Sequence, residues 1–159
     1  MKLKMAIPVL MREASECDVE SIWGLLAEYS KKRLLLPRTR EEIRQRLPAF
    51  IIAELDGSFA GCVALRDFGG GLYEIRSLAV PEGLNGSGIG TALVNEAVSR
   101  LKTSAPCRVF ALTYRAKLFK RAGFKIVDKS LFPQKIWSDC SLCPKKESCD
   151  ETAVLLELE

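Results

Sequence analysis

The sequence predicts a mixed α/β fold in which helices flank a single sheet, and three observations support this prediction. Two apolar runs meet at Asp56-Gly57, the two-residue signal of a β-hairpin with a type I′ turn. Another apolar run enters a glycine-rich turn that opens an amphipathic helix, and a strand-helix-strand pattern follows. A hairpin before the turn and alternating strands and helices after it together indicate a mixed sheet.

The first expected elements are a strand and an amphipathic helix. We predict the strand at Val9–Glu13, and Ser15 with Asp18 as the cap of the helix that follows. Apolar residues recur along this helix at a spacing that puts them on one face, namely Val19, Ile22, Trp23 and Leu26.

A basic segment, residues 31–46, comes next and holds seven Lys or Arg against two Glu. Thr39 with Glu42 three residues later is a capping-box signal, so we expect a second helix to begin there and to stop at Pro48.

The remaining elements follow from apolar runs separated by glycines. Gly123 has the position of a glycine that ends a short helix. Gly69 to Gly71 should end the second strand of the hairpin and form a loop. In chain order we predict strands at 50–55, 59–65 and 72–80, a strand at 108–113, a helix at 115–122, and strands at 124–127 and 153–158.

Length and composition limit the classes of protein that fit. A chain of 159 residues predicts one domain, 1–159, with a cysteine-containing segment at 130–152 inside it. A net charge of +4 without a strong basic stripe argues against nucleic-acid binding. No stretch is long and apolar enough to span a bilayer, and the first apolar run lacks a cleavage site, so we expect a cytoplasmic protein with no membrane partner.

Histidine is absent and cysteine is frequent, with six residues. An acid or base must therefore come from Glu, Asp, Tyr, Cys or water. We expect Cys17, Cys62 and Cys107 to be small core residues. The other three resemble half of a zinc site, and reduced loop thiols or a local disulfide are the alternatives; these three are Cys140, Cys143 and Cys149.

The glycine-rich turn predicts an anion site. Gly86, Gly88 and Gly90 are expected to take positive φ and to let a ligand approach the backbone, just before a helix N-terminus. The helix is indicated by Ile89, Leu93, Ala97 and Leu101. A Walker loop is excluded because no Lys follows the glycines, and a dinucleotide fingerprint fits poorly because no acidic residue lies about twenty positions downstream. An ordinary strand-to-helix turn is the plain alternative.

Residues 85–90, N-G-S-G-I-G, resemble the pyrophosphate loop [QR]-x-x-G-x-[GA] of the GNAT superfamily of acyl-CoA-dependent N-acyltransferases, although Asn85 replaces the usual Arg or Gln. Residues 112–124, LTYRAKLFKRAGF, are similar to that family's second signature. The resemblance implies a mostly antiparallel central sheet with splayed parallel strands, and acetyl-CoA as cosubstrate. The residues it implies for coenzyme binding are Leu78, Ala79, Val80, Asn85, Gly86, Ser87, Gly88, Ile89, Gly90, Thr91, Phe119 and Arg121.

The same resemblance implies one catalytic residue, Glu74, and leaves the source of the second proton open between Tyr114 and water. Glu74 is expected to act as a base, commonly through water, and alternation predicts that it shares a face with Arg76, Leu78 and Val80. A structural Glu74–Arg76 ion pair is the alternative. The family's general-acid Tyr is replaced by Phe119, so either Tyr114 supplies a hydroxyl or the thiolate leaves unaided, since a thiol with a pKa near 8.5 leaves readily.

The acceptor is suggested by three segments, 34–43, 74–80 and 131–154, which look like the acetyltransferase domain of N-acetylglutamate synthases in its short form. This resemblance implies transfer to the α-amine of glutamate, in arginine biosynthesis, with the substrate carboxylates held by Arg38, Arg76 and Lys135. For Arg38, a solvated loop charge is the alternative. An acetyltransferase for another amine, a CoA-sensing or metal-binding module without catalysis, and a homodimer all stay open.

Overall fold

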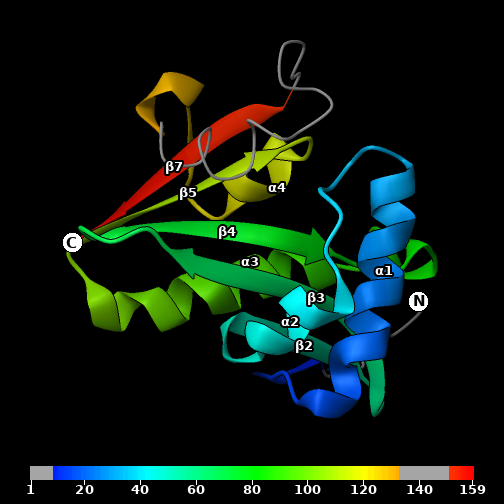
Figure 1. Ribbon diagram of the computed structural model, residues 1–159. Coiled ribbons are helices and arrows are strands. Elements are labelled where there is room, and N and C mark those ends of the chain that lie inside the picture. Colours follow the sequence, from blue (N-terminus) through cyan, green and yellow to red (C-terminus); the bar gives the residue numbers. More distant parts are fainter. Residues whose placement is uncertain (1–8, 133–150) are drawn as a thin grey trace, which may run out of the picture.

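A computed structural model describes residues 9–132 and 151–159, and its seven strands form one sheet in the order β1-β2-β3-β4-β5-β7-β6 (Figure 1). The strands are β1 (Val9–Glu13), β2 (Phe50–Leu55), β3 (Ser58–Asp67), β4 (Leu72–Ala79), β5 (Cys107–Thr113), β6 (Lys125–Val127) and β7 (Thr152–Leu158). Every pairing is antiparallel except that of β4 with β5. The predicted mixed α/β sheet is therefore confirmed.

The hairpin of β2 and β3 turns at the two residues that the sequence indicated. Asp56 has a φ of 51° and Gly57 a φ of 77°, so both central residues are left-handed, as a type I′ turn requires. This twist matches that of the flanking strands and fixes their register.

The parallel pair β4 and β5 stays together only over its first three positions, from Leu72 opposite Arg108 to Glu74 opposite Phe110. Beyond Glu74 the two strands diverge, and β5 continues to pair with β7 as far as Thr113 (Figure 1). The expected splay of two parallel strands in the middle of the sheet is confirmed.

Within residues 9–132 and 151–159, α-helices α1 to α4 cover the two faces of the sheet (Figure 1). Their apolar side chains assign α3 and α4 to one face and α1 and α2 to the other. The helices are α1 (Val19–Lys31), α2 (Arg40–Gln45), α3 (Ile89–Leu101) and α4 (Ala116–Arg121).

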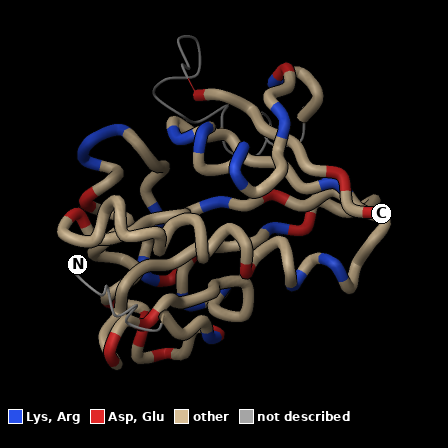
Figure 2. Tube along the Cα trace, turned by 180° about the vertical axis from the view of Figure 1, so that it is seen from behind, with Lys and Arg blue, Asp and Glu red and all other residues tan. Residues whose placement is uncertain are grey.

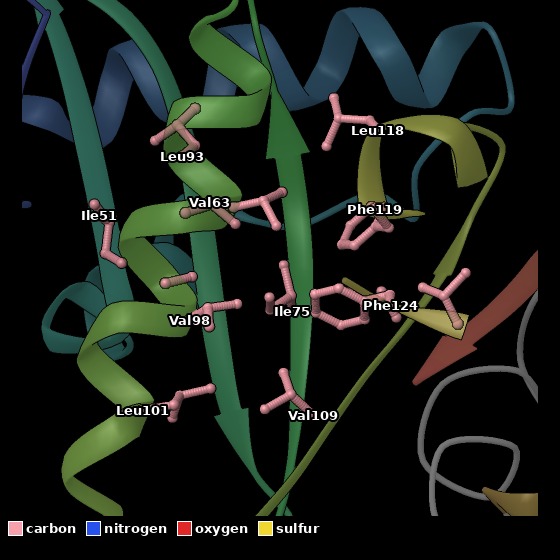
Figure 3. Packing of buried hydrophobic residues seen from close by; sticks show 14 of the residues in the cluster. Ile51, Val63, Ile75, Leu93, Val98, Leu101, Val109, Leu118, Phe119 and Phe124 are labelled. Atoms are coloured by element: carbon pink, nitrogen blue, oxygen red, sulfur yellow. The ribbon is translucent and has the colours of Figure 1, made fainter. Parts of the chain in front are cut away.

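The larger core lies between α3 and the sheet. Figure 3 shows Leu93, Val98 and Leu101 of α3 among side chains of the strands, including Ile51 and Val63. The residues that predicted this helix by their spacing, Ile89, Leu93, Ala97 and Leu101, are all buried. Each buried aliphatic side chain of this kind contributes about 1.5–3 kcal/mol, so the helix start next to the glycine loop is firmly anchored.

On the opposite face, α1 buries Val19, Ile22 and Leu26 as predicted. Its start is preceded by a 3-10 turn, Glu16–Asp18, in which the backbone N–H of Ser15 donates to an Asp18 carboxylate oxygen at 2.7 Å. The Asp18 carboxylate also accepts two hydrogen bonds from Arg12 of β1, at 2.6 and 2.8 Å.

The short helix α2 has the predicted capping box, in which Glu42 N donates to Thr39 Oγ1 at 3.1 Å and Thr39 N to Glu42 Oε1 at 3.2 Å. Six residues are too few for a helix to hold alone. Side chains attach it to α1, because Arg40 lies 3.8 Å over the Trp23 ring and 2.7 Å from Glu20.

Two of the three cysteines expected in the core are there, since Cys62 and Cys107 are buried. Cys17 is exposed, and for it the prediction was wrong. It belongs to the 3-10 turn ahead of α1 rather than to the buried face of the helix, so helical spacing did not apply to it. None of the helices in residues 9–132 and 151–159 has the length and apolar character to cross a bilayer.

Candidate active site

The glycine loop joins the end of β4 to α3 through a 3-10 turn, Glu82–Leu84. Gly86 and Gly88 have φ of 80° and 89°, and a Cβ on either would meet open space. Glycine is needed here for conformation rather than for room. The first hydrogen bond of α3 runs from Ala92 N to Gly88 O at 3.0 Å, so the preceding amides have no carbonyl partner within the helix.

Gly90 differs from the prediction because it lies inside the first turn of α3, without positive φ. Its missing side chain serves packing, since a Cβ would come 3.0 Å from Leu118 Cδ1 and 3.7 Å from Arg115 Nη1. The glycine therefore lets α4 approach the start of α3 closely.

A hollow of about 510 Å³ opens above this loop. Its polar lining includes three cations of α4 and the residue before it, Arg115, Lys117 and Arg121. Figure 2 shows Lys and Arg gathered on this part of the chain. Of the coenzyme residues implied by the resemblance, those that line this hollow are Val80, Asn85, Gly86, Gly88, Ile89, Gly90, Thr91 and Arg121. Ser87 is not among them, and its hydroxyl donates to Leu84 O.

A second hollow, of about 90 Å³, lies where β4 and β5 diverge. Leu78 and Ala79 of β4 line it together with Phe119 of α4, which is buried and packs edge-on against Phe124 with ring centroids 5.3 Å apart. Tyr29 of α1 and Tyr114, which follows β5, also line it, and its other polar lining residues are Arg76, Ser77, Thr113, Arg115 and Glu151.

A β-bulge in β4 overturns one prediction about its faces. Cys62 and Ala64 of β3 face Ala79 and Arg76, so β4 carries one residue more than its partner over this interval. Ser77 within it has a φ of 53°. The extra residue reverses the alternation, so Leu78 and Val80 pack toward α3 and do not continue the face of Glu74 and Arg76.

Glu74 and Arg76 are neighbours on the face of α1 and α2. Glu74 Oε1 lies 3.5 Å from Arg76 Nε, and the two side chains are only 3% and 8% exposed. Charges at this depth require close partners, and the pair supplies part of that compensation. Glu74 is also the last residue of β4 that pairs with β5, so it lies where the splay begins.

Arginines from three places in the chain line a third hollow, of about 20 Å³. Arg38 precedes α2, Arg46 follows it and Arg76 comes from β4. Glu42 lines the same hollow, with its carboxylate 3.9 Å from Arg38 Nη1. Arg38 and Arg76, expected together from the resemblance, do adjoin one hollow. Arg46 was missed, because nothing in the sequence pattern distinguishes it from the other cations of residues 31–46.

The three hollows follow one another along the molecule. The 510 and 90 Å³ hollows share Tyr114 and Arg115, and the 90 and 20 Å³ hollows share Arg76 and Ser77. We call this series of adjoining hollows, from the glycine loop past the splayed strands to the three arginines, the path.

Cys62 lies beside this path but is unsuited to covalent chemistry. Its thiol is buried, donates to Ser77 O at 3.5 Å, and has its pKa raised to about 12 by desolvation. Lys135, Cys140, Cys143 and Cys149 lie outside the described residues. Within the described ranges, no group of three or more Cys, Asp or Glu side chains is arranged to hold a metal ion.

Comparison with known proteins agrees with this geometry. Residues 12–124 match the model of the acetyltransferase (GNAT) family. An uncharacterized N-acetyltransferase of Chlorobaculum tepidum is 38% identical over 96% of this chain and 99% of its own length. An amino-acid acetyltransferase of Mycobacterium tuberculosis is 33% identical over 75% of this chain and 70% of its own.

Solved structures extend the likeness to the fold. N-acetylglutamate synthase of Neisseria gonorrhoeae, complexed with coenzyme A and N-acetyl-glutamate, has a TM-score of 0.83 and 25% identity, over 96% of this chain but 35% of its own. A Mycobacterium tuberculosis protein in complex with CoA has a TM-score of 0.80 and 28% identity, over 94% and 99%. The chain is an N-acetyltransferase related to amino-acid acetyltransferases, and it belongs to the acetyltransferase (GNAT) family.

Proposed function

We propose that this chain transfers the acetyl group of acetyl-CoA directly to the α-amine of L-glutamate, as a step of arginine biosynthesis. The observation that carries the proposal is the path of three adjoining hollows, with the N-terminus of α3 and three cations at one end and three arginines at the other. Such a path suits a donor and an acceptor that meet in the middle.

The coenzyme fits the first part of this path. The diphosphate would lie on the amides of Gly88 to Thr91 at the positive end of α3, with Arg115 and Arg121 adding charge. Backbone groups of β4 beyond Glu74 have no partner on β5 among the described residues, and the pantetheine amides would pair along Leu78–Val80 there.

The acceptor fits the other end. A hollow of 20 Å³ has room for about one water-sized group, which suits a carboxylate end rather than a whole amino acid. Arg38, Arg46 and Arg76 offer planar guanidinium groups, which bind carboxylates better than ammonium groups do. A polyamine would need an acidic lining, which a single glutamate among three arginines does not provide.

The chemistry is aminolysis of a thioester: the amine nitrogen forms a bond to the acetyl carbon, the carbon–sulfur bond breaks, and the thiolate takes a proton. Glu74 is our proposed base, acting through water on the ammonium proton of the acceptor. Tyr114 lines both the coenzyme and the central hollow, so we assign it the proton for the leaving sulfur. Since a thiolate leaves readily, Tyr114→Phe should slow turnover by only about ten-fold.

A thiol-release assay with acetyl-CoA tests the proposal. Glutamate should be consumed well above aspartate, glutamine, polyamines and peptides, with N-acetylglutamate identified as product. Release with one of the other amines instead would reassign the acceptor, and no release with any of them would favour a CoA sensor.

A further inference from the structure

Tyr29, which no sequence motif singled out, connects the central hollow to the coenzyme hollow. Its hydroxyl donates to the main-chain carbonyl of Val80 at 2.6 Å. Tyr29 lines the central hollow with Leu34 and Leu35, while Val80 lines the coenzyme hollow. Figure 1 shows β4 ending beside α1, so this one bond ties α1, which lines the central hollow, to the strand that enters the glycine loop.

The chain around Tyr29 is shaped to keep it there. After α1, Arg33 N donates to Ser30 O at 2.9 Å and Leu34 N to Tyr29 O at 3.0 Å, the bond pattern of a Schellman turn. Its left-handed position is filled by Arg33, with a φ of 59°, where glycine is the usual residue. This turn brings Leu34 back beside Tyr29, and both line the central hollow.

A second link between the same two segments is the ion pair of Lys32 with Glu82. Both side chains are exposed, at 46% and 67%, and a pair in that setting adds little to stability. The Tyr29 bond is the better-defined link because it is short, partly buried and made to the main chain.

Val80 is a point where the sheet itself no longer holds the chain. Among the described residues, β4 pairs with β3 only as far as Ala79 and with β5 only as far as Glu74. The position of Val80 relative to α1 therefore depends on contacts such as that with Tyr29.

We propose that Tyr29 is a positioning residue that couples acceptor binding to coenzyme binding, by fixing the end of β4 against the wall of the central hollow, which adjoins both the acceptor hollow and the coenzyme hollow. This inference rests on the proposed function only in assigning the two hollows to acceptor and coenzyme. Acceptor binding orders α1 and the Leu34 wall, and the hydroxyl transmits that order to the loop that holds the diphosphate.

The variant Tyr29→Phe keeps the ring and removes the bond. Calorimetry with CoA alone should show a Kd about three- to ten-fold weaker than wild type, the loss expected for one partly buried hydrogen bond. The Kd for CoA measured with and without saturating glutamate should differ in the wild type, and this difference should shrink toward none in Tyr29→Phe.

Tyr73→Phe is the matched control, because Tyr73 lies at the paired start of β4, outside the lining of the three hollows, and should leave both quantities unchanged. Unaltered CoA affinity and unaltered coupling in Tyr29→Phe would overturn the proposal, as would equal losses in Tyr73→Phe. The proposed function fails separately, if wild type releases no thiol with glutamate; the effect of Tyr29→Phe on CoA affinity alone then still tests the link between α1 and β4.

Discussion

The coenzyme end of the site consists mainly of backbone groups, whereas the acceptor end consists mainly of charged side chains. The proposed coenzyme end is centred on a contiguous stretch, Val80 to Thr91, with backbone amides and two left-handed glycines, to which Arg115 and α4 add cations. The acceptor end collects side chains from distant positions, Arg38, Arg46 and Arg76, and holds them by pairs between side chains. Substitutions at the coenzyme end should therefore act by changing the backbone conformation. Substitutions at the acceptor end should act by changing charge and side-chain packing.

The largest effect should come from Gly88→Val at the coenzyme end. A β-branched residue is strongly disfavoured at a φ of 89°, so the loop would leave its conformation and misalign the amides of α3. We expect the Kd for CoA to weaken on the order of 100-fold, measured by calorimetry. Gly57→Val imposes similar strain at a φ of 77° in the hairpin and should leave CoA binding unchanged; equal losses in both variants would show that the loop has no special role.

At the acceptor end, Arg76→Met and Arg38→Met should differ from each other. Removing Arg76 takes away the cation 3.5 Å from the buried Glu74 carboxylate, so the free energy of unfolding should fall by about 3–5 kcal/mol, measured with urea. Arg38 is more exposed, and its loss should raise KM for glutamate about ten-fold with little change in stability. Arg100→Met, on α3, is the control for KM. An unchanged KM for glutamate in both Arg76→Met and Arg38→Met would show that the arginine-lined hollow does not bind the acceptor.

Acid should weaken the anchorage of α1, which supports the acceptor end. Hydrogen bonds from Arg12 hold the pKa of Asp18 below its ordinary value of 3.8. The folded state therefore gains stability from the ionised carboxylate above that pH and loses it as pH falls through the lowered value. Stability of wild type should drop below about pH 4, and Asp18→Asn should be less stable at pH 7 with a shallower decline. Parallel stability curves for the two proteins would contradict this.

The smallest expected effect is a gain in the free energy of unfolding. Arg33→Gly relieves the left-handed position after α1 and should stabilise the fold by about 1 kcal/mol in urea unfolding. Lys31 lies two residues earlier and is the last residue of α1. Lys31→Gly should therefore destabilise the fold by about 0.5–1 kcal/mol, because glycine is a poor helix former. If both variants change stability in the same direction, the left-handed strain at Arg33 is not significant.

The comparison of the two ends also explains what the sequence could predict. The type I′ turn at Asp56-Gly57, the capping box at Thr39 and the helix after Gly88 are all set by neighbours within a few residues, and each was found at its expected place. The family's loop motif depends on the same local rules, so most residues of the β4–α3 connection that line the 510 Å³ hollow could be predicted, although Ser87 does not line it.

The features that sequence reasoning missed depend on partners far away in the chain. The bulge at Ser77 arises from the register of β3 against β4, and it reversed the predicted faces of Leu78 and Val80. Arg46 and Arg115 look like any other cation in a basic run until the fold brings them beside the hollows. Tyr29 matters only because Val80, fifty-one positions away, lies under its hydroxyl.

Amide chemical shifts followed by NMR during titration with CoA test directly whether main-chain N–H groups of the glycine loop hold the diphosphate. We expect the largest changes in chemical shift at Gly86 and from Gly88 to Thr91. The changes should saturate with CoA concentration according to the Kd measured by calorimetry. Saturating CoA that leaves these amides unmoved while others shift would contradict this expectation.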